Sequence, residues 1–214
     1  MIHTKKNSAN AAIGTDPSVL KDIHDPAKNI AIYQRNIERL GQELHQLAEQ
    51  SVEFRASGSI ADILSQLRDY AEAALSPCPA LIEDVNLQLN LFQKTTQSST
   101  FRLLFATVCT NMCRKFHTDV NELRLLCTYF GPGTLWVPDD AIGQAASTSR
   151  ETRGELSLDL TQVQQAGSGD VVLLKGALYP GANPILHRSP TIEENGDKRL
   201  LLRIDLNESL ELLI

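Results

Sequence analysis

The sequence lacks the features that define several large classes of protein. No uninterrupted apolar run approaches the roughly 20 residues of a membrane-spanning helix, so no membrane partner is expected. No basic tract could neutralise a phosphate backbone, and the formal net charge of −6 argues against nucleic acid as a partner. The N-terminus also has no apolar core of a signal peptide, so we expect a cytoplasmic protein.

Cysteine is scarce as well, with only Cys78, Cys109, Cys113 and Cys127 in 214 residues. This number and spacing exclude the dense disulfide framework of a small secreted protein, and reduced thiols are expected. What is present is ordinary for a globular protein: 42% of the residues are hydrophobic and 21% are charged. The length is sufficient for one generous domain.

The chain changes character near Phe101, which predicts an α+β organisation within one compact domain. Before that point apolar residues recur at helical spacing, and after it short apolar runs alternate with turn residues. The expected segments are a flexible lead-in (1–28), a mainly helical N-terminal layer (29–98), a β-rich core (99–206) and a C-terminal tail (207–214).

The helical half contains three predicted helices. Apolar residues three and four apart over Ile30–Leu47 predict the first, although Ile30–Tyr33 could instead form a short strand. Ser59 could cap a second helix that begins at Ile60. Pro79 suits the first turn of a third helix.

The second half reads as many short strands joined by turns that contain glycine and proline. This pattern favours a sandwich or a barrel over parallel strands with crossover helices. The expected strands are Arg102–Val108, Leu123–Phe130, Thr134–Val137, Glu155–Leu160, Asp170–Leu174, Ile185–His187 and Arg199–Leu206. The long polar segment 138–153 is either a lid over a site or a disordered loop.

The most informative motif is His117-Thr118-Asp119. In an extended segment, side chains two residues apart share a face, so His117 and Asp119 would point into one space. A second histidine from another strand, His187, would complete a set of two histidines and one carboxylate. Such a set holds iron(II) on one side and leaves the opposite coordination positions open.

A His-x-Asp pair is weak evidence by itself, but burial strengthens it. An ionised Asp119 facing into a barrel without a partner would cost at least several kcal/mol, so it needs a metal or a cation. Arg114 or Arg124 could supply that cation in a salt bridge. His187 could likewise only form a hydrogen bond at a strand end.

Three arginines near the second histidine could bind a ligand carboxylate. Arg199 begins the strand that follows His187, and its guanidinium offers a fixed fork of donors. Arg203 lies on the same strand face. Arg188 is adjacent to His187 but on the opposite strand face, so it is either a carboxylate anchor at the rim or a surface charge.

This arrangement resembles the iron(II)- and 2-oxoglutarate-dependent dioxygenases, especially their prolyl-hydroxylase-like branch. The shared pattern is His-x-Asp, a long gap, a second His, and an arginine one strand later, with Gly169–Leu174 and Gly196–Leu202 similar to the flanking strands. The resemblance implies a double-stranded β-helix core of the jelly-roll or cupin-like type. The residues that it implies for iron(II) are His117, Asp119 and His187, and those for 2-oxoglutarate are Arg199 and, as further candidates, Arg203 and Arg188.

A more specific string is similar to an uncharacterised bacterial family known only as a domain of unknown function. This likeness covers roughly residues 25–206 and is strongest over 113–205. The residues that carry it are Cys113–Asp119, Leu123–Tyr129, Gly131–Thr134, Leu174–Gly176 and His187–Pro190. The wider resemblance implies a hydroxylase-type oxidation of a C–H bond, with release of succinate and CO2, on an unknown small molecule or protein side chain.

Cys113 departs from the oxygenase pattern. In an extended segment it would share a face with His117, and a thiolate ligand favours zinc(II) over a catalytic iron site. Its alternative role is that of a small buried residue. The second functional hypothesis is therefore a non-catalytic metal-binding protein, which could hold zinc in metal homeostasis. A third is a barrel that has lost its metal and serves as a binding module.

Overall fold

The computed structural model describes residues 8–143, 157–181 and 183–207. Its main element is a seven-stranded sheet with the strand order β1-β2-β10-β5-β12-β4-β3. Neighbouring strands are antiparallel except for β1 and β2, which run parallel. The strands are β1 (Ala11–Gly14), β2 (Ile30–Tyr33), β3 (Glu53–Gly58), β4 (Phe101–Val108), β5 (Leu123–Phe130), β10 (Val171–Lys175) and β12 (Arg199–Leu206).

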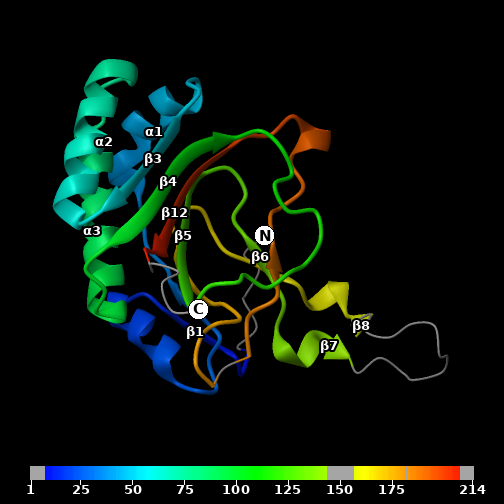
Figure 1. Cartoon of the computed structure of the whole chain (residues 1–214). Helices are drawn as coiled ribbons and strands as arrows, with labels where there is room; N and C mark the ends of the chain where they lie inside the picture. The colour runs from blue at the N-terminus through cyan, green and yellow to red at the C-terminus, as the bar shows by residue number, and fades with distance from the viewer. Residues whose placement is uncertain (1–7, 144–156, 182, 208–214) are drawn as a thin grey trace, which may run out of the picture.

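A smaller sheet faces the large one. It has the order β11-β6-β9, and a two-stranded hairpin of β7 and β8 lies beside it (Figure 1). These strands are β6 (Leu135–Trp136), β7 (Ile142–Gly143), β8 (Ser157–Leu158), β9 (Gln164–Gln165) and β11 (His187–Arg188). The two facing sheets form the sandwich of a mixed α/β fold.

Helices cover the other face of the large sheet, on the left in Figure 1. They are α1 (Gly41–Ala48), α2 (Ile60–Ala74) and α3 (Pro79–Thr96). Short 3-10 helices are η1 (Pro17–His24), η2 (Glu38–Leu40), η3 (Asp139–Ala141), η4 (Leu160–Gln162) and η5 (Glu193–Asn195). No helix in these described ranges is long and apolar enough to cross a membrane.

The central strands of the large sheet are buried on both faces, and side-chain alternation divides their residues between two cores. On β10, Val171 and Leu173 pack in the core under the helices, whereas Val172 and Leu174 pack in the core between the sheets. Trp136 from β6 joins this second core and is 1% exposed. Such strands read as continuous apolar runs because neither face meets water.

Several sequence predictions are confirmed at residue level. Strands β5 and β12 have the predicted bounds, and Pro79 is the first residue of α3. Ser59 caps α2 in a capping box, in which its side chain accepts from the Asp62 amide and the Asp62 carboxylate accepts in return. These features depend on local chemistry that a sequence displays directly.

The N-terminal half contributes strands to the large sheet. Residues 30–33 form strand β2, which was the alternative to a helix start, and β2 pairs with both β1 and β10. The described part of the expected lead-in contains β1, which extends the sheet, and η1, which buries Leu20 and Ile23. A mainly helical layer over 29–98 is not confirmed, since this segment also contributes β2 and β3 to the sheet. Most of segment 138–153 and the tail after residue 207 lie outside the described residues.

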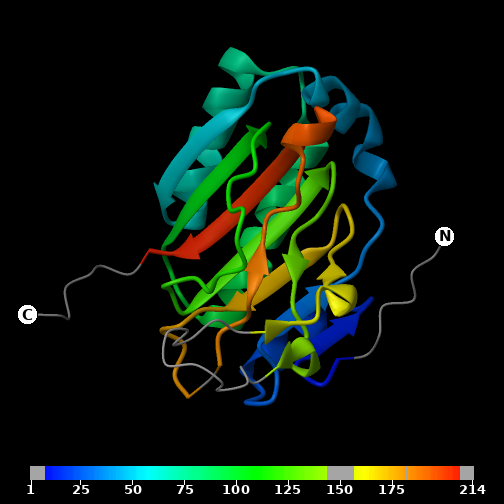
Figure 2. The same cartoon turned by 90° about the vertical axis from the view of Figure 1, so that its right-hand side faces the viewer.

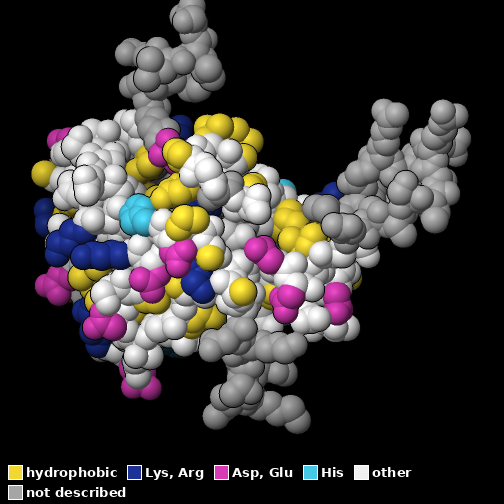
Figure 3. All heavy atoms as spheres, turned by 90° about the horizontal axis from the view of Figure 1, so that it is seen from below, with side chains coloured by type: hydrophobic (Ala, Val, Ile, Leu, Met, Phe, Trp, Pro, Cys, Tyr) yellow, Lys and Arg dark blue, Asp and Glu magenta, His cyan; other side chains and the backbone are white. Residues whose placement is uncertain are grey.

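Charged side chains of both signs are interspersed on the face seen in Figure 3, which views the molecule from below the orientation of Figure 1. Apolar side chains lie between them. This face therefore presents a mixed surface, in keeping with a composition in which Asp and Glu exceed Lys and Arg by a small margin.

A buried ionic cluster fastens the helices to the sheet. The Asp84 carboxylate on α3 is 0% exposed and accepts two hydrogen bonds from Arg35, at 2.7 and 2.8 Å. It also accepts from Arg39 at 2.9 Å, from the Tyr129 hydroxyl at 2.8 Å and from Gln88 at 3.0 Å. Burial alone would raise the pKa of Asp84, but the hydrogen bonds and charge of Arg35 outweigh it and lower that pKa.

We expect Asp84→Asn to lower the free energy of unfolding by about 3–5 kcal/mol, because it leaves the buried Arg35 without its anion. Asp69→Asn, at an exposed position on α2, is the matched control and should change stability little. Urea unfolding measures both. Folding lowers the pKa of Asp84. The contribution of Asp84 to the free energy of unfolding should therefore be complete above the usual carboxyl pKa of about 4 and decline as the pH falls below it. Equal unfolding midpoints for the two variants would contradict the role of this cluster.

Candidate metal centre

The candidate centre begins with a backbone bridge between two histidines. The His117 amide donates to the His187 carbonyl at 3.0 Å, and the His187 amide donates to the His117 carbonyl at 3.0 Å. The segment around His117 forms no strand, and His117 pairs with His187 as an isolated bridge. His187 begins β11, which is held in the small sheet by β6. The two imidazole rings lie 4.6 Å apart.

Local hydrogen bonds orient both imidazoles. The Nδ1 atom of His117 lies 3.2 Å from the Lys115 carbonyl, and Nδ1 of His187 lies 3.2 Å from the Ile185 carbonyl. A carbonyl oxygen can only accept, so Nδ1 carries the proton in each bond. In the neutral imidazoles the Nε2 atoms would then be free to donate a lone pair, which is the arrangement that a metal-binding histidine requires.

The two Nε2 atoms face one carboxylate. His117 Nε2 lies 3.5 Å from Asp119 Oδ1, and His187 Nε2 lies 3.4 Å from Asp119 Oδ2. One ligand atom from each residue falls within 4.8 Å of the others, and no other such group of ligating side chains occurs among the residues that the structure describes. Ligands about 2.1 Å from a metal in adjacent positions are roughly 3 Å apart, so the observed spacing suits a shared ion.

Arg124 holds the carboxylate from the side of the sheet. Its Nη1 atom is 2.5 Å from Asp119 Oδ2, and its Nε atom is 2.6 Å from Asp205 Oδ1 on the neighbouring strand β12. Arg114 pairs instead with Glu193, at 2.8 Å. Burial would raise the pKa of Asp119, but its contact with His187 and the nearby charge of Arg124 lower it to about 2. The carboxylate is therefore ionised throughout the neutral range and available to a cation.

Arg199 is a buried cation that has no anionic partner in the described part of the chain. Its side chain is 1% exposed, and its Nη2 atom donates to the Thr128 hydroxyl at 2.9 Å and to the Thr134 hydroxyl at 3.4 Å. No carboxylate of the described residues lies within ion-pair distance of it, and its Nε atom has no hydrogen-bond acceptor there. Burial lowers the pKa of Arg199 to about 10. A buried, unpaired guanidinium is costly unless a ligand neutralises it.

Backbone geometry places Arg199 beside the two histidines. Gly131, after β5, has φ +81°, and a Cβ there would lie 2.1 Å from the Lys198 carbonyl oxygen. Only glycine therefore allows the chain to approach the start of β12 this closely. The register between β5 and β12 also shifts at Leu200–Leu201. The result is one cavity lined by His117, His187, Thr134 and Arg199.

The remaining predicted residues occupy the edge of this cavity. Arg203 lines it and contacts Asp205 Oδ2 at 3.1 Å. Arg188 also lines it, and its guanidinium lies over the Phe116 ring, 5.2 Å from the centroid. Cys113 lines the cavity too, but its sulfur does not belong to the group of ligand atoms around Asp119.

Sequence reasoning missed the two threonines around Arg199 and the role of Asp205. Thr128 lies in an apolar strand pattern and Thr134 follows a turn, so neither has a distinctive local signal. Asp205 is two residues beyond Arg203 on β12, and this period of two was the available clue that it faces the same space.

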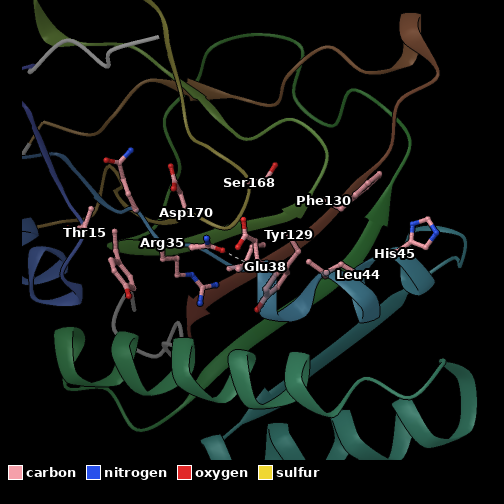
Figure 4. Close-up of a pocket in the computed structure, with 14 residues that line it drawn as sticks. Thr15, Arg35, Glu38, Leu44, His45, Tyr129, Phe130, Ser168 and Asp170 are labelled. Atoms are coloured by element: carbon pink, nitrogen blue, oxygen red, sulfur yellow. Dashed lines mark hydrogen bonds between the residues drawn. The ribbon is translucent and has the colours of Figure 1, made fainter. Parts of the chain in front are cut away.

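The largest hollow lies elsewhere. It measures about 1070 Å³ and is lined by the segment after β2, by α1 and by the end of β5 (Figure 4). Arg35 in its wall already pairs with Asp84, and His45 projects from α1. No group of three metal-ligating side chains is found there among the described residues. Chemistry therefore points to the smaller cavity around His117 and His187.

Several solved structures are similar to this chain at very low sequence identity. The dioxygenase for auxin oxidation 1 from Arabidopsis thaliana, in its 2-oxoglutarate complex, aligns with a TM-score of 0.50 and 8% identity, over 95% of this chain and 94% of that one. A prolyl-4-hydroxylase from Pseudomonas putida aligns at 0.43 and 10%, over 90% and 98%. A bsmA homolog from Methylobium petroleophilum aligns at 0.46 and 10%, over 88% and 91%. The first of these likenesses shows the fold of a 2-oxoglutarate oxygenase, the double-stranded β-helix.

A search among curated proteins finds no match to the sequence. A family model described as "Protein of unknown function (DUF1826)" matches residues 14–205. This match includes both histidines, Asp119 and Arg199. The chain therefore belongs to the DUF1826 family, whose fold here resembles that of iron(II)- and 2-oxoglutarate-dependent oxygenases.

Proposed function

We propose that this protein is an iron(II)- and 2-oxoglutarate-dependent oxygenase. The observation that carries the proposal is a two-histidine, one-carboxylate group whose histidines line one cavity with Arg199, a buried arginine that has no anionic partner among the described residues. The first provides three ligands for iron(II) and leaves positions open. The second would meet a carboxylate of the cosubstrate.

The donor set fits iron(II). His117, Asp119 and His187 would hold the metal, because the backbone carbonyls fix both imidazoles with Nε2 toward Asp119. Arg124 would keep the carboxylate in place through its second ion pair with Asp205. Bound iron(II) with 2-oxoglutarate and O2 as co-reactants would supply the oxidising chemistry for a C–H bond of the substrate.

Arg199 would bind and orient 2-oxoglutarate. Its guanidinium is fixed by the hydroxyls of Thr128 and Thr134, so it would meet a carboxylate without first losing side-chain freedom. Arg203 is the weaker candidate, since Asp205 already contacts it. The apolar wall formed by Leu126 and Leu201 would exclude water from this end of the cavity.

A metal-handling protein remains the alternative from another class. Zinc storage has no use for a buried carboxylate anchor, so Arg199 favours the oxygenase. Cys113 favoured zinc in the sequence, but its sulfur is not part of the ligand group around Asp119. The two functions differ in whether 2-oxoglutarate binds to the metal-loaded protein.

Replacing either histidine should remove the metal. We expect His117→Ala and His187→Ala to bind less than a tenth of the iron(II) bound by the original protein in equilibrium dialysis, since each variant loses one of three ligands. His45→Ala, on the exposed face of α1, is the matched control and should bind normally. Unchanged metal content in either site variant would exclude this centre.

Arg199→Met should weaken cosubstrate binding without lowering the stability of the fold. We expect affinity for 2-oxoglutarate to fall about 100-fold, which is ~2.7 kcal/mol and within the range for removing one partner of a buried charge pair. The measurement is the anaerobic charge-transfer band of the iron(II) protein as 2-oxoglutarate is added. The free energy of unfolding should stay equal or rise, because a buried unpaired charge has been removed.

Two comparisons make this experiment decisive. Arg68→Met, an exposed position on α2, should leave the band unchanged. Loss of the band in Arg203→Met but not in Arg199→Met would transfer the anchoring role to Arg203. An absent band in the original protein, together with tight zinc binding that depends on Cys113, would overturn the oxygenase proposal.

A further inference from the structure

A second groove lies beside the metal-centre cavity, on the same face of the large sheet. It runs over strands β12, β4 and β3, of which β3 is the edge strand (Figure 2). Arg203 lines both hollows and so lies between them. The residues that line the groove are Arg55, Ala56, Ser57, Gln66, Arg102, Leu103, Leu104 and Arg203.

The strand register explains how three arginines come together there. Leu104 on β4 is paired with Arg203 on β12 and with Arg55 on β3. The two arginines therefore lie on either side of one leucine, about 10 Å apart because each strand spacing is about 4.8 Å. Arg102 occupies the next position of the same face, opposite Asp205. The three arginines therefore place their guanidinium groups around the apolar side chain of Leu104.

Carboxylates of the described residues neutralise the charges of these three arginines only weakly. Arg55 contacts only Glu53, at 3.5 Å, and both side chains are about two-thirds or more exposed, so the pair is weak. Arg102 donates to the Leu206 carbonyl at 3.5 Å and has no carboxylate within ion-pair distance among the described residues. Asp205 serves both Arg124 and Arg203. No Asp or Glu of the described residues lines the groove itself.

We propose that this groove binds an anionic group, a carboxylate or a phosphate, of the substrate that is oxidised at the metal centre. The inference rests on the proposed function, because it assigns the groove to the same reaction. Guanidinium forks match carboxylate and phosphate oxygens, and three of them around one leucine suit a small molecule with an acidic end and an apolar body. Arg203, at the junction, would direct the rest of the substrate toward the two histidines.

The burial of the arginines also distinguishes the groove from the proposed 2-oxoglutarate site. Arg199 lies deep in the cavity and is 1% exposed, whereas Arg55 and Arg102 are exposed on the open side of the sheet. One buried guanidinium satisfies the distal carboxylate of 2-oxoglutarate. The surface arginines are left for a second anion that approaches from solvent, where long-range attraction also raises the rate of encounter.

Calorimetry on the anaerobic iron(II) protein, saturated with 2-oxoglutarate, tests this proposal. The probes are tricarballylate, its uncharged triamide and inorganic pyrophosphate, so that carboxylate and phosphate binding are measured separately. We expect at least one anionic probe to bind and the triamide not to bind. The double variant Arg55→Gln/Arg102→Gln should bind the anionic probe with about 10-fold lower affinity, as expected for the loss of two solvent-exposed charges.

The matched control is Arg68→Gln/Lys94→Gln, which removes two exposed charges from helices α2 and α3. It should bind the probes as the original protein does, and affinity for 2-oxoglutarate should be unchanged in both double variants. Equal probe binding by the groove variant and the control, or equal binding of the triamide, would overturn the groove proposal while leaving the oxygenase proposal intact. Groove-dependent probe binding without any 2-oxoglutarate binding would overturn the oxygenase instead.

A turnover screen gives an independent readout. Compounds that stimulate succinate release should carry a carboxylate or phosphate, and the groove variant should raise their KM about 10-fold with a smaller effect on kcat. Substrates that are neutral or cationic, with a KM that the groove variant does not change, would contradict the assignment.

Discussion

The desolvation of charge on the inner face of the large sheet is the constraint on which the site depends. Strands β5 and β12 are buried on both faces, yet they place Arg124, Arg199, Arg203 and Asp205 between the two sheets. A charge in such a position must be paired or must bind a ligand. On the inner face, some charged side chains are paired within the protein and Arg199 is not. This difference distinguishes structural residues from candidate ligand-binding residues.

Arg124 is satisfied within the protein, whereas Arg199 is not. Arg124 is shared by Asp119 and Asp205 and so connects the Asp119 carboxylate to the centre of the sheet. The hydrogen-bond acceptors of Arg199 among the described residues are two threonine hydroxyls. An apolar residue would avoid the cost of burying an unpaired charge at that position. Asp84, under the helices, shows the opposite solution, in which several donors neutralise one buried carboxylate.

The parts of the fold that could be predicted are those with local signals. Ser59 and Pro79 mark helix starts by their own chemistry, and apolar runs mark β5 and β12. Strand β2 could not be recognised with certainty, because its residues also fit a helical spacing and its partner β10 lies far along the chain. The convergence of His117, Asp119 and His187 could be argued from spacing and resemblance. The threonines around Arg199 could not, since their position depends on the shift in register between β5 and β12.

The pairing of His117 with His187 also has a consequence for biosynthesis. The two histidines are joined across a long stretch of chain, and β12, which follows both, lies between β5 and β4 in the finished sheet. Until residues 199–206 have been synthesised, β5 and β4 cannot have their common neighbour, and until His187 has been synthesised its bridge to His117 cannot form. Non-local pairings of this kind form late. The group of His117, Asp119 and His187 therefore assembles late in synthesis, although its first two members are made earlier.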